Sequence, residues 1–281
     1  MIICFSGNGN TLAVARRLAD DLADSVVSLC GDTLLHPAEH PLELSPGERV
    51  VWTFPVYSWG VPPVVRRFIR QARIIGADLA THFMVATMGD DAGLTADMWR
   101  ADLAKRSWHA ASAFGVIMPN TYVCFPGFNI DSPTVAAAKL QAMPARVTAI
   151  AQAITQASAT SIPSAVASTH DDIHRGALPR LKTRLIYPLF VRFAMSPSRF
   201  RVDPAKCIAC ARCARHCPLD NITLQSSLPT TPQPRQSTKI LPHWGNNCAT
   251  CLACFHICPT GAISRGPVSR GKSRYPGPNN L

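Results

Sequence analysis

Five short apolar runs alternate with amphipathic stretches in the first half of the chain. They are MIICFS (1–6), SVVSL (25–29), RVVWTFPV (49–56), HFMVATM (82–88) and AASAFGVIM (110–118). Runs of this length, separated by helical patterns, are typical of buried parallel strands joined by crossover helices. The pattern predicts an α/β domain over residues 1–157, built on a doubly wound parallel sheet of five strands.

Two of the intervening stretches have a helical period. Apolar residues recur in a helix that begins at Thr11 (Leu12, Ala15, Ala19, Leu22) and in a second one near residue 150 (Leu140, Met143, Val147, Ile150, Ile154). We expect both groups to face the core rather than a cofactor. Pro144 falls inside the second pattern and predicts a kink or a late start of that helix.

The apolar pattern weakens after residue 157. The stretch ASATSIPSAVASTHDDIHRG (157–176) is typical of a linker, and LKTRLIYPLFVRFAMSPSRF (181–200) predicts a basic, aromatic helix. We expect this helix to pack between two domains, with attachment to a membrane surface as the alternative. Pro188 and Arg192 interrupt its most apolar part, which is too short to span a bilayer, so no transmembrane helix is predicted. Residues 158–200 are assigned to the linker and this bridging helix, and residues 201–281 to a second, smaller domain.

Charge is distributed unevenly over the 281 residues. The net charge is +11, with −1 in residues 1–157 and +12 in residues 158–281. The basic part favours an acidic protein partner. It does not favour nucleic acid, because the charges surround cysteines instead of forming a basic face with stacking aromatics. The start of the chain lacks the basic and small-residue pattern of a secretory signal, so we expect a cytoplasmic, reducing compartment.

Two cysteine runs carry the strongest chemical signal. CIACARCARHCP (207–218) and CATCLACFHICP (248–259) repeat at an offset of 41 residues and hold eight of the 11 cysteines. In a reducing compartment such density favours metal ligation over disulfides. The C-x2-C-x2-C-x3-C-P spacing is that of bacterial proteins with two iron–sulfur clusters. Structural zinc is the alternative, but paired C-x2-C units leave the third cysteine and the proline unexplained.

The residues around these runs are assigned simpler roles. His216 and His256 lie beside the cysteines, but four-cysteine sets are complete without them, so we expect packing or exposed side chains. Cys4, Cys30 and Cys124 are expected to be structural. The stretch 226–242 between the runs predicts a surface loop, and the tail 265–281 predicts irregular structure.

Three loops follow predicted strands at the edge where a doubly wound sheet binds its ligand. SGNGNT (6–11) opens into a helix, which favours a phosphate at the helix N-terminus, with an ordinary capping turn as the alternative. FPVYSWGVPP (54–63) offers Tyr57 and Trp59 as flat surfaces for a ring system, unless they only fill the loop core. ATMGDDAG (86–93) contains glycines that permit close approach to a ligand, and its Asp91 is a candidate helix cap.

Taken together, these motifs resemble a bacterial and archaeal family of flavodoxin and ferredoxin fusions. SGNGNT is similar to the flavodoxin phosphate loop, with Asn8 where threonine is usual, and MPNTYV (118–123) and LPHW (241–244) are also similar to that family. The resemblance implies a flavodoxin-like doubly wound five-stranded parallel sheet, followed by a small α+β domain like the bacterial ferredoxins with two 4Fe-4S clusters.

The resemblance also implies FMN and two 4Fe-4S clusters as cofactors. The FMN phosphate would be held by Ser6, Asn8, Gly9, Asn10 and Thr11. The isoalloxazine ring would be flanked by Pro55, Val56, Tyr57, Ser58, Trp59 and Gly60 and by Thr87, Met88, Gly89, Asp90 and Gly93, with Tyr57 or Trp59 stacked on it. One cluster would take Cys207, Cys210, Cys213 and Cys258, and the other Cys248, Cys251, Cys254 and Cys217. Ile222 and Ile263 would cover the clusters.

These expectations favour an electron-transfer protein that links a redox partner to a flavin through two clusters. Two alternatives remain at this point: a flavin-dependent reductase of a small substrate, fed by its ferredoxin domain, and a ferredoxin whose flavodoxin-like domain no longer binds FMN. The sequence contains no Ser-His-Asp set, HExxH motif or paired-carboxylate arrangement that suggests itself as acid–base machinery, so no catalytic residue is assigned.

Overall fold

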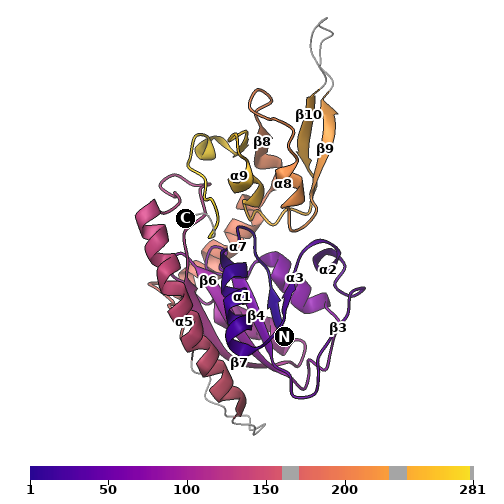
Figure 1. Ribbon diagram of the computed structural model, residues 1–281, viewed down its shortest axis with the longest axis vertical. Helices are drawn as coiled ribbons and strands as arrows, with labels where there is room; N and C mark the ends of the chain where they lie inside the picture. Colours follow the sequence, from indigo (N-terminus) through magenta and orange to yellow (C-terminus); the bar gives the residue numbers. More distant parts are fainter. Residues whose placement is uncertain (160–170, 228–238, 279–281) are drawn as a thin grey trace, which may run out of the picture.

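A five-stranded parallel sheet forms the centre of the first half of the chain (Figure 1). The computed structural model describes residues 1–159, 171–227 and 239–278. The strands are β1 (Ile2–Cys4), β2 (Val26–Ser28), β4 (Val50–Pro55), β6 (Thr81–Met88) and β7 (His109–Ile117). Their spatial order is β2-β1-β4-β6-β7, all parallel. This order is that of a flavodoxin-like doubly wound sheet, so the predicted fold class is confirmed.

Helices cover both faces of this sheet. On one face lie α1 (Asn10–Leu22) and α5 (Pro133–Ala159), whose apolar side chains pack with Ile2, Val51 and Phe83. On the other face lie α3 (Pro63–Gln71) and α4 (Thr95–Ala104), which bury Phe68 and Trp99. Three short elements complete the domain: α2 (Gly31–Leu35), β3 (Leu42–Glu43) and β5 (Ile74–Ile75). None of the described helices is both long enough and apolar enough to cross a membrane.

Both predicted helical faces pack against the core of the first domain. In α5, Val147, Ile150 and Ile154 are buried as predicted, and the helix runs through Pro144 instead of beginning after it. In α1 the buried face is centred on Val14 and Leu18, while Leu12, Ala19 and Leu22 are only half-buried. Ala15 is buried, and Leu12, Ala19 and Leu22 pack against the same apolar cluster as α5, so the predicted face of α1 meets the core.

The segment before the second domain is more ordered than a linker. Its residues 160–170 lie outside the described part, but Asp172 pairs with Phe114 of the edge strand β7 through backbone hydrogen bonds. A continuous helical segment follows: α6 (Pro179–Leu181), the π turn η1 (Lys182–Ile186), α7 (Tyr187–Leu189) and the π turn η2 (Phe190–Ala194). We call residues 178–194 the bridging helix, because it lies between the two domains in Figure 1.

The second domain consists of short strands and two short helices around the cysteine runs. The short 3-10 helix η3 (Pro197–Arg199) leads into β8 (Phe200–Val202), which pairs antiparallel with β11 (Ile263–Arg265). The strands β9 (Ile222–Ser227) and β10 (Lys239–Trp244) also pair antiparallel. The helices are α8 (Arg212–Arg215) and α9 (Ala253–Ile257), and η4 (Pro267–Ser269) begins the tail. The centre of the predicted surface loop, residues 228–238, lies outside the described residues, and its described ends form β9 and β10.

The internal repeat seen in the cysteine spacing extends to the backbone. Ala209 and Ala211 adopt positive φ angles of 55° and 59°, and Thr250 and Leu252, 41 residues later, adopt 55° and 64°. The helices α8 and α9 and the strands β9 and β11 begin at the same offset. Each cysteine run therefore folds into the same loop, in which left-handed residues turn the chain between successive cysteines.

A buried histidine lies within the core of the first domain. His82 packs beside Trp52 and Trp108, which also pack on each other. Its Nδ1 accepts from Trp52 Nε1 at 3.0 Å, and its Nε2 lies 2.8 Å from the Ala77 carbonyl oxygen. Because an indole N–H can only donate, Nδ1 is the acceptor and Nε2 carries the single proton. Burial lowers the pKa of His82 to about 4, so the ring is neutral near pH 7.

This histidine predicts a loss of stability in acid. The unfolded chain protonates His82 below about pH 6.5, whereas the folded ring resists protonation until about pH 4, so the unfolded state gains protons first. We expect this residue to remove about 2 kcal/mol of folding free energy between about pH 7.5 and about pH 5. Urea unfolding of the wild type and of His82→Gln measures the difference at each pH. If the free energy of unfolding fell equally with decreasing pH in both proteins, the prediction would be contradicted.

Candidate functional site

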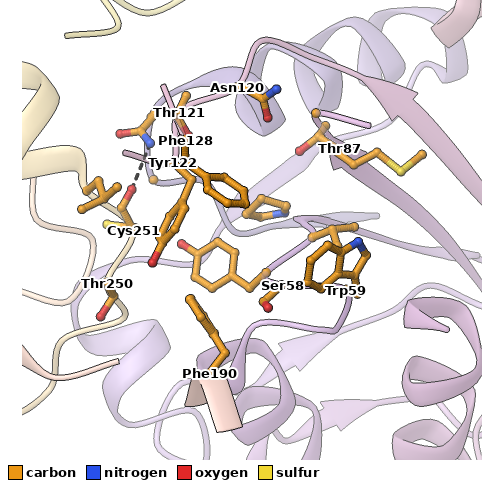
Figure 2. Close-up of a pocket in the computed structure, with 18 of the residues that line it drawn as sticks. Ser58, Trp59, Thr87, Asn120, Thr121, Tyr122, Phe128, Phe190, Thr250 and Cys251 are labelled. Atoms are coloured by element: carbon orange, nitrogen blue, oxygen red, sulfur yellow. Dashed lines mark hydrogen bonds between the residues drawn. The ribbon is translucent and has the colours of Figure 1, made fainter. Parts of the chain in front are cut away.

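A cavity of about 710 Å³ lies at the carboxyl ends of the parallel strands, between the two domains. It is lined by the residues that follow β1, β4, β6 and β7, by the bridging helix, and by residues 250–252 of the second domain. Figure 2 shows Trp59 and Thr87 on one side of the cavity and Thr250 and Cys251 on the other. Its size and its apolar wall with a few polar groups are typical of a site for a small organic ligand.

The loop after β1 presents a polar end of the cavity at the N-terminus of α1. Ser6 Oγ is buried and has no hydrogen-bond partner among the described residues. Gly9 precedes the helix with φ 90°, and no side chain caps the first turn, so the N–H groups there are available to an anion. The side chains of Asn10 and Thr11 are engaged within the protein, with the Pro119 carbonyl oxygen at 3.0 Å and with Thr87 Oγ1 at 2.7 Å.

The C-terminal tail returns to this loop, which the sequence did not indicate. The Tyr275 hydroxyl donates to Asn10 Oδ1 at 2.5 Å, and the Tyr275 backbone N–H donates to His256 Nδ1 at 3.0 Å. His256 is buried, and its Nε2 lies 2.8 Å from the Thr121 carbonyl oxygen, whereas His216 is exposed. The tail thus connects the second domain to the loop after β1 of the first.

The loop after β4 makes a tight turn that directs two aromatic side chains to the cavity. Tyr57 and Gly60 exchange two backbone hydrogen bonds, at 2.9 and 3.0 Å, around Ser58 and Trp59, which have φ angles of 45° and 64°. Positive φ at two residues other than glycine is strained, and such turns persist where the surrounding contacts hold them. Here the bridging helix does so, since Thr183 Oγ1 donates to the Trp59 carbonyl oxygen at 2.7 Å.

A third wall of the cavity comes from the loop after β7, from which no site residue was predicted. Its members include Asn120, Tyr122 and Phe128, and the Tyr122 ring lies 5.8 Å from that of Phe190 on the bridging helix. Figure 2 shows the rings of Tyr122, Phe128 and Phe190 along the same part of the cavity. The position of MPNTYV directly after the last strand was the signal that could have identified this wall, because all carboxyl ends of parallel strands meet at one edge.

Thirteen of the sixteen predicted flavin-contacting residues line the cavity. They are Ser6, Asn8, Asn10, Thr11, Pro55, Val56, Tyr57, Ser58, Trp59, Thr87, Met88, Gly89 and Asp90. Gly9, Gly60 and Gly93 are outside this lining, and each allows close packing behind it, against Pro278, Tyr187 and Trp59 respectively. Asp91 does not cap α4, which begins after Leu94. Its Oδ2 instead pairs with Lys182 Nζ at 2.7 Å.

The eight cysteines of the two runs form two groups. Cys213 lies near Cys207, Cys210 and Cys258, which also line a small hollow together. Cys254 lies near Cys251, Cys248 and Cys217. We call these the outer set (Cys207, Cys210, Cys213, Cys258) and the inner set (Cys217, Cys248, Cys251, Cys254). In each set the fourth cysteine comes from the other run, and no described group of His, Cys, Asp or Glu converges on a single metal ion.

Each set contains buried cysteines: Cys213 and Cys258 in the outer set and Cys254 in the inner set. Burial, together with a smaller effect of neighbouring thiolates of the same set, raises the pKa of Cys213 to about 11 and that of Cys251 to about 12. Cys258 differs, because hydrogen bonds from Ile263 and Thr260 outweigh burial and lower its pKa. Buried thiolates require positive charge, which bound iron would supply. Ile222 and Ile263 are buried in the same apolar cluster as Cys213 and Cys254, while Cys4 is in the core, Cys124 is half-buried and Cys30 is exposed.

The inner set lies directly against the cavity. A Cβ at Gly7 would lie 2.6 Å from Cβ and 3.3 Å from Sγ of Cys251, and Asn8 Nδ2 donates to the Cys251 carbonyl oxygen at 2.9 Å. Burial raises the pKa of Tyr57 well above its usual value, and nearby Cys251 and Cys248 raise it further. Thus the loop after β1 contacts Cys251 of the inner set, and Tyr57 of the loop after β4 lies near that set.

Comparison with known proteins identifies the second domain. Residues 206–262 match the family model described as a 4Fe-4S dicluster domain, which confirms the expected iron–sulfur domain at this end of the chain. None of the curated proteins compared with the chain matches it.

Solved structures with partial similarity were also found. One is the Trp repressor binding protein from Bacillus subtilis, with 14% identity and a TM-score of 0.34 over 52% of this chain and 96% of that chain. Another is the metal-soaked flavodiiron core of Flv1 from Synechocystis sp. PCC6803, with 14% identity and a TM-score of 0.30 over 56% of this chain and 36% of that chain. With identities and TM-scores this low, the flavodoxin-like fold of the first domain is assigned from its strand order alone. The chain therefore joins a flavodoxin-like α/β domain to a 4Fe-4S dicluster domain.

Proposed function

We propose that the protein transfers electrons between a redox partner, its two 4Fe-4S clusters and FMN bound in the cavity. The observation that carries this proposal is Cys251, which belongs to the inner set and also lines the cavity. FMN exchanges one or two electrons, whereas each cluster passes one. A protein that holds the two side by side can convert between one-electron and two-electron chemistry.

The residues at the polar end of the cavity fit a phosphate. The Ser6 hydroxyl is a buried donor without a described partner, and the first N–H groups of α1 point to the same place. Asn10 and Thr11 would contribute their backbone N–H groups, because their side chains are bound within the protein. Tyr57 and Trp59 would offer the flat surfaces for the ring system, with Tyr57 on the side of the inner set.

The outer set supports entry of electrons from a protein partner. Ile208, which follows Cys207, is 62% exposed, and Lys206, Arg212 and Arg215 are exposed around it. An acidic redox protein would be attracted to this surface, and added salt would slow its association. Electrons would then pass from the outer to the inner cluster and on to the cavity.

A second function is favoured by one observation. The lining of the cavity also includes the aromatic side chains of Phe128, Phe190 and Phe193. Reduction of a small apolar substrate next to the flavin would use this part of the lining. Turnover of a small acceptor without any protein partner would distinguish this reductase from a simple electron carrier.

The proposal is tested by quantifying iron, sulfide and flavin in anaerobically purified, reconstituted protein. We expect about eight irons per chain, held as two clusters, and one FMN. Zinc in place of iron would refute the cluster part. Protein with full iron content that does not bind FMN would refute the flavin part and leave a ferredoxin with an attached α/β domain.

Replacing Ser6 by alanine tests the phosphate end of the site. We expect Ser6→Ala to weaken FMN binding about tenfold, because a hydrogen bond to a charged group contributes about 1.5 kcal/mol. Riboflavin lacks the phosphate, so its affinity should not change. Fluorescence titration of both ligands measures this difference. An equal loss for FMN and riboflavin would show that the hydroxyl does not contact the phosphate.

A further inference from the structure

The bridging helix carries a stripe of exposed apolar side chains. Leu178, Leu181, Leu185, Leu189 and Phe193 follow each other at intervals of three or four residues and are between 46% and 67% exposed. Thr183, Tyr187 and Ala194 occupy the opposite side and are buried, with the Tyr187 hydroxyl donating to the Val61 carbonyl oxygen at 2.6 Å. The helix is therefore docked on the protein with its most apolar side facing outward, which marks an interaction surface.

A second apolar edge continues this surface. Phe125 and Phe128 of the loop after β7 are 42% and 51% exposed, and both line the cavity together with Leu189 and Phe193 of the stripe. The stripe and these two rings account for most of the large apolar side chains exposed in the described part of the first domain and the bridging helix. Exposed apolar side chains of the loop and of the stripe therefore line part of the cavity.

Basic side chains accompany the stripe. Residues 173–202 contain seven Arg or Lys and no Asp or Glu. Arg184 and Arg192 are exposed, and neither forms a salt bridge with the described residues, while the Arg192 guanidinium lies 5.7 Å from the Phe193 ring. Leucine and phenylalanine on one side, flanked by arginines, form the pattern of helices that lie in a membrane interface. The arginines can reach lipid phosphates while the apolar side chains enter the acyl boundary.

We propose that this surface, the bridging helix stripe with Phe125 and Phe128, binds the surface of an anionic phospholipid membrane. Charge complementarity favours anionic lipid over a neutral one. A lipid surface also accepts a long row of aliphatic side chains without any matching groove. An acidic protein partner would need a groove shaped to fit them. In this position the exposed apolar side chains that line the cavity face the acyl chains. The inference does not depend on bound flavin or iron.

Sedimentation of the full-length protein with vesicles tests this inference. We expect binding to vesicles that contain phosphatidylglycerol, weaker binding as salt is raised, and little binding to phosphatidylcholine alone. The double change Leu185→Glu and Leu189→Glu should weaken binding about 100-fold, because two apolar side chains no longer enter the lipid. Leu79→Glu is the matched control, since Leu79 is 89% exposed at a different site, and it should bind like the wild type.

The charges are tested separately. Arg184→Gln with Arg192→Gln should weaken binding to phosphatidylglycerol vesicles about 30-fold, because each basic residue near an anionic surface contributes about a factor of five. All four substituted residues are exposed, so iron content and circular dichroism should not change. Failure of the wild type to bind any vesicle would overturn the proposal. A dimer in solution that the Leu185→Glu and Leu189→Glu change dissociates would also overturn it, because the stripe would then bind a second copy of the chain. So would binding of an acidic protein to the stripe by a wild type that binds no lipid.

Discussion

Serine in place of Cys217 is expected to remove the inner cluster, although Cys217 belongs to the first cysteine run. The structure groups Cys217 with Cys248, Cys251 and Cys254 of the second run. Serine is a poor ligand for iron, so the set would lose its fourth thiolate. We expect iron to fall from about eight to about four atoms per chain, with the outer cluster retained. Iron and sulfide analysis together with paramagnetic resonance of the reduced protein measures this.

The reciprocal variant provides the comparison. Cys258→Ser should leave the inner cluster and remove the outer one, with the same iron content but a different resonance signal. Cys30→Ser is the control, because Cys30 is exposed and belongs to neither set. Of the two variants with half the iron, only Cys258→Ser keeps a cluster next to the cavity. If Cys217→Ser retained the inner signal and lost the outer one, the assignment of the fourth ligands would be wrong.

The parallel sheet could be predicted from the sequence because its evidence is local. A strand buried on both faces needs apolar side chains at every position, and residues 50–54 are all buried, so the run itself identifies the strand. The cysteine spacing is local in the same sense, since one loop must direct three thiols to one place. Both features depend on residues that are close together in the chain.

The walls of the cavity could not be predicted in this way. Tyr275 contacts Asn10 across 265 positions, and Thr183 holds the Trp59 carbonyl oxygen across 124. Such contacts follow from how the domains and the bridging helix dock, and no periodicity near Tyr275 or Thr183 indicates them. The exposed stripe is similar: its apolar period is visible in the sequence, but a buried helix face would show the same period. Only the burial of Tyr187 on the opposite side distinguishes the two.

Valine in place of Gly7 is expected to disturb the flavin site and the inner cluster together. A Cβ at this position would lie 2.6 Å from Cβ of Cys251, a distance that real side chains do not adopt, so the loop or the cysteine must move. Overpacking of this kind costs about 1–3 kcal/mol. Because the same loop supplies Ser6 and the first N–H groups of α1, we expect FMN affinity to fall about 100-fold. Flavin titration and the resonance signal of the inner cluster measure the two effects.

The coupling of these effects separates a shared contact from a general loss of stability. Gly47→Ala is the control, because a Cβ there meets nothing within 4 Å and adds only the local strain of a φ of 79°. It should leave FMN affinity and both clusters unchanged. Gly7→Ala should give a smaller version of the Gly7→Val effect, since the first added carbon already meets Cys251. If Gly7→Val weakened FMN binding but left the inner cluster signal unchanged, the loop and the cysteine would move independently. The contact between Gly7 and Cys251 would then not couple the flavin site to the inner cluster.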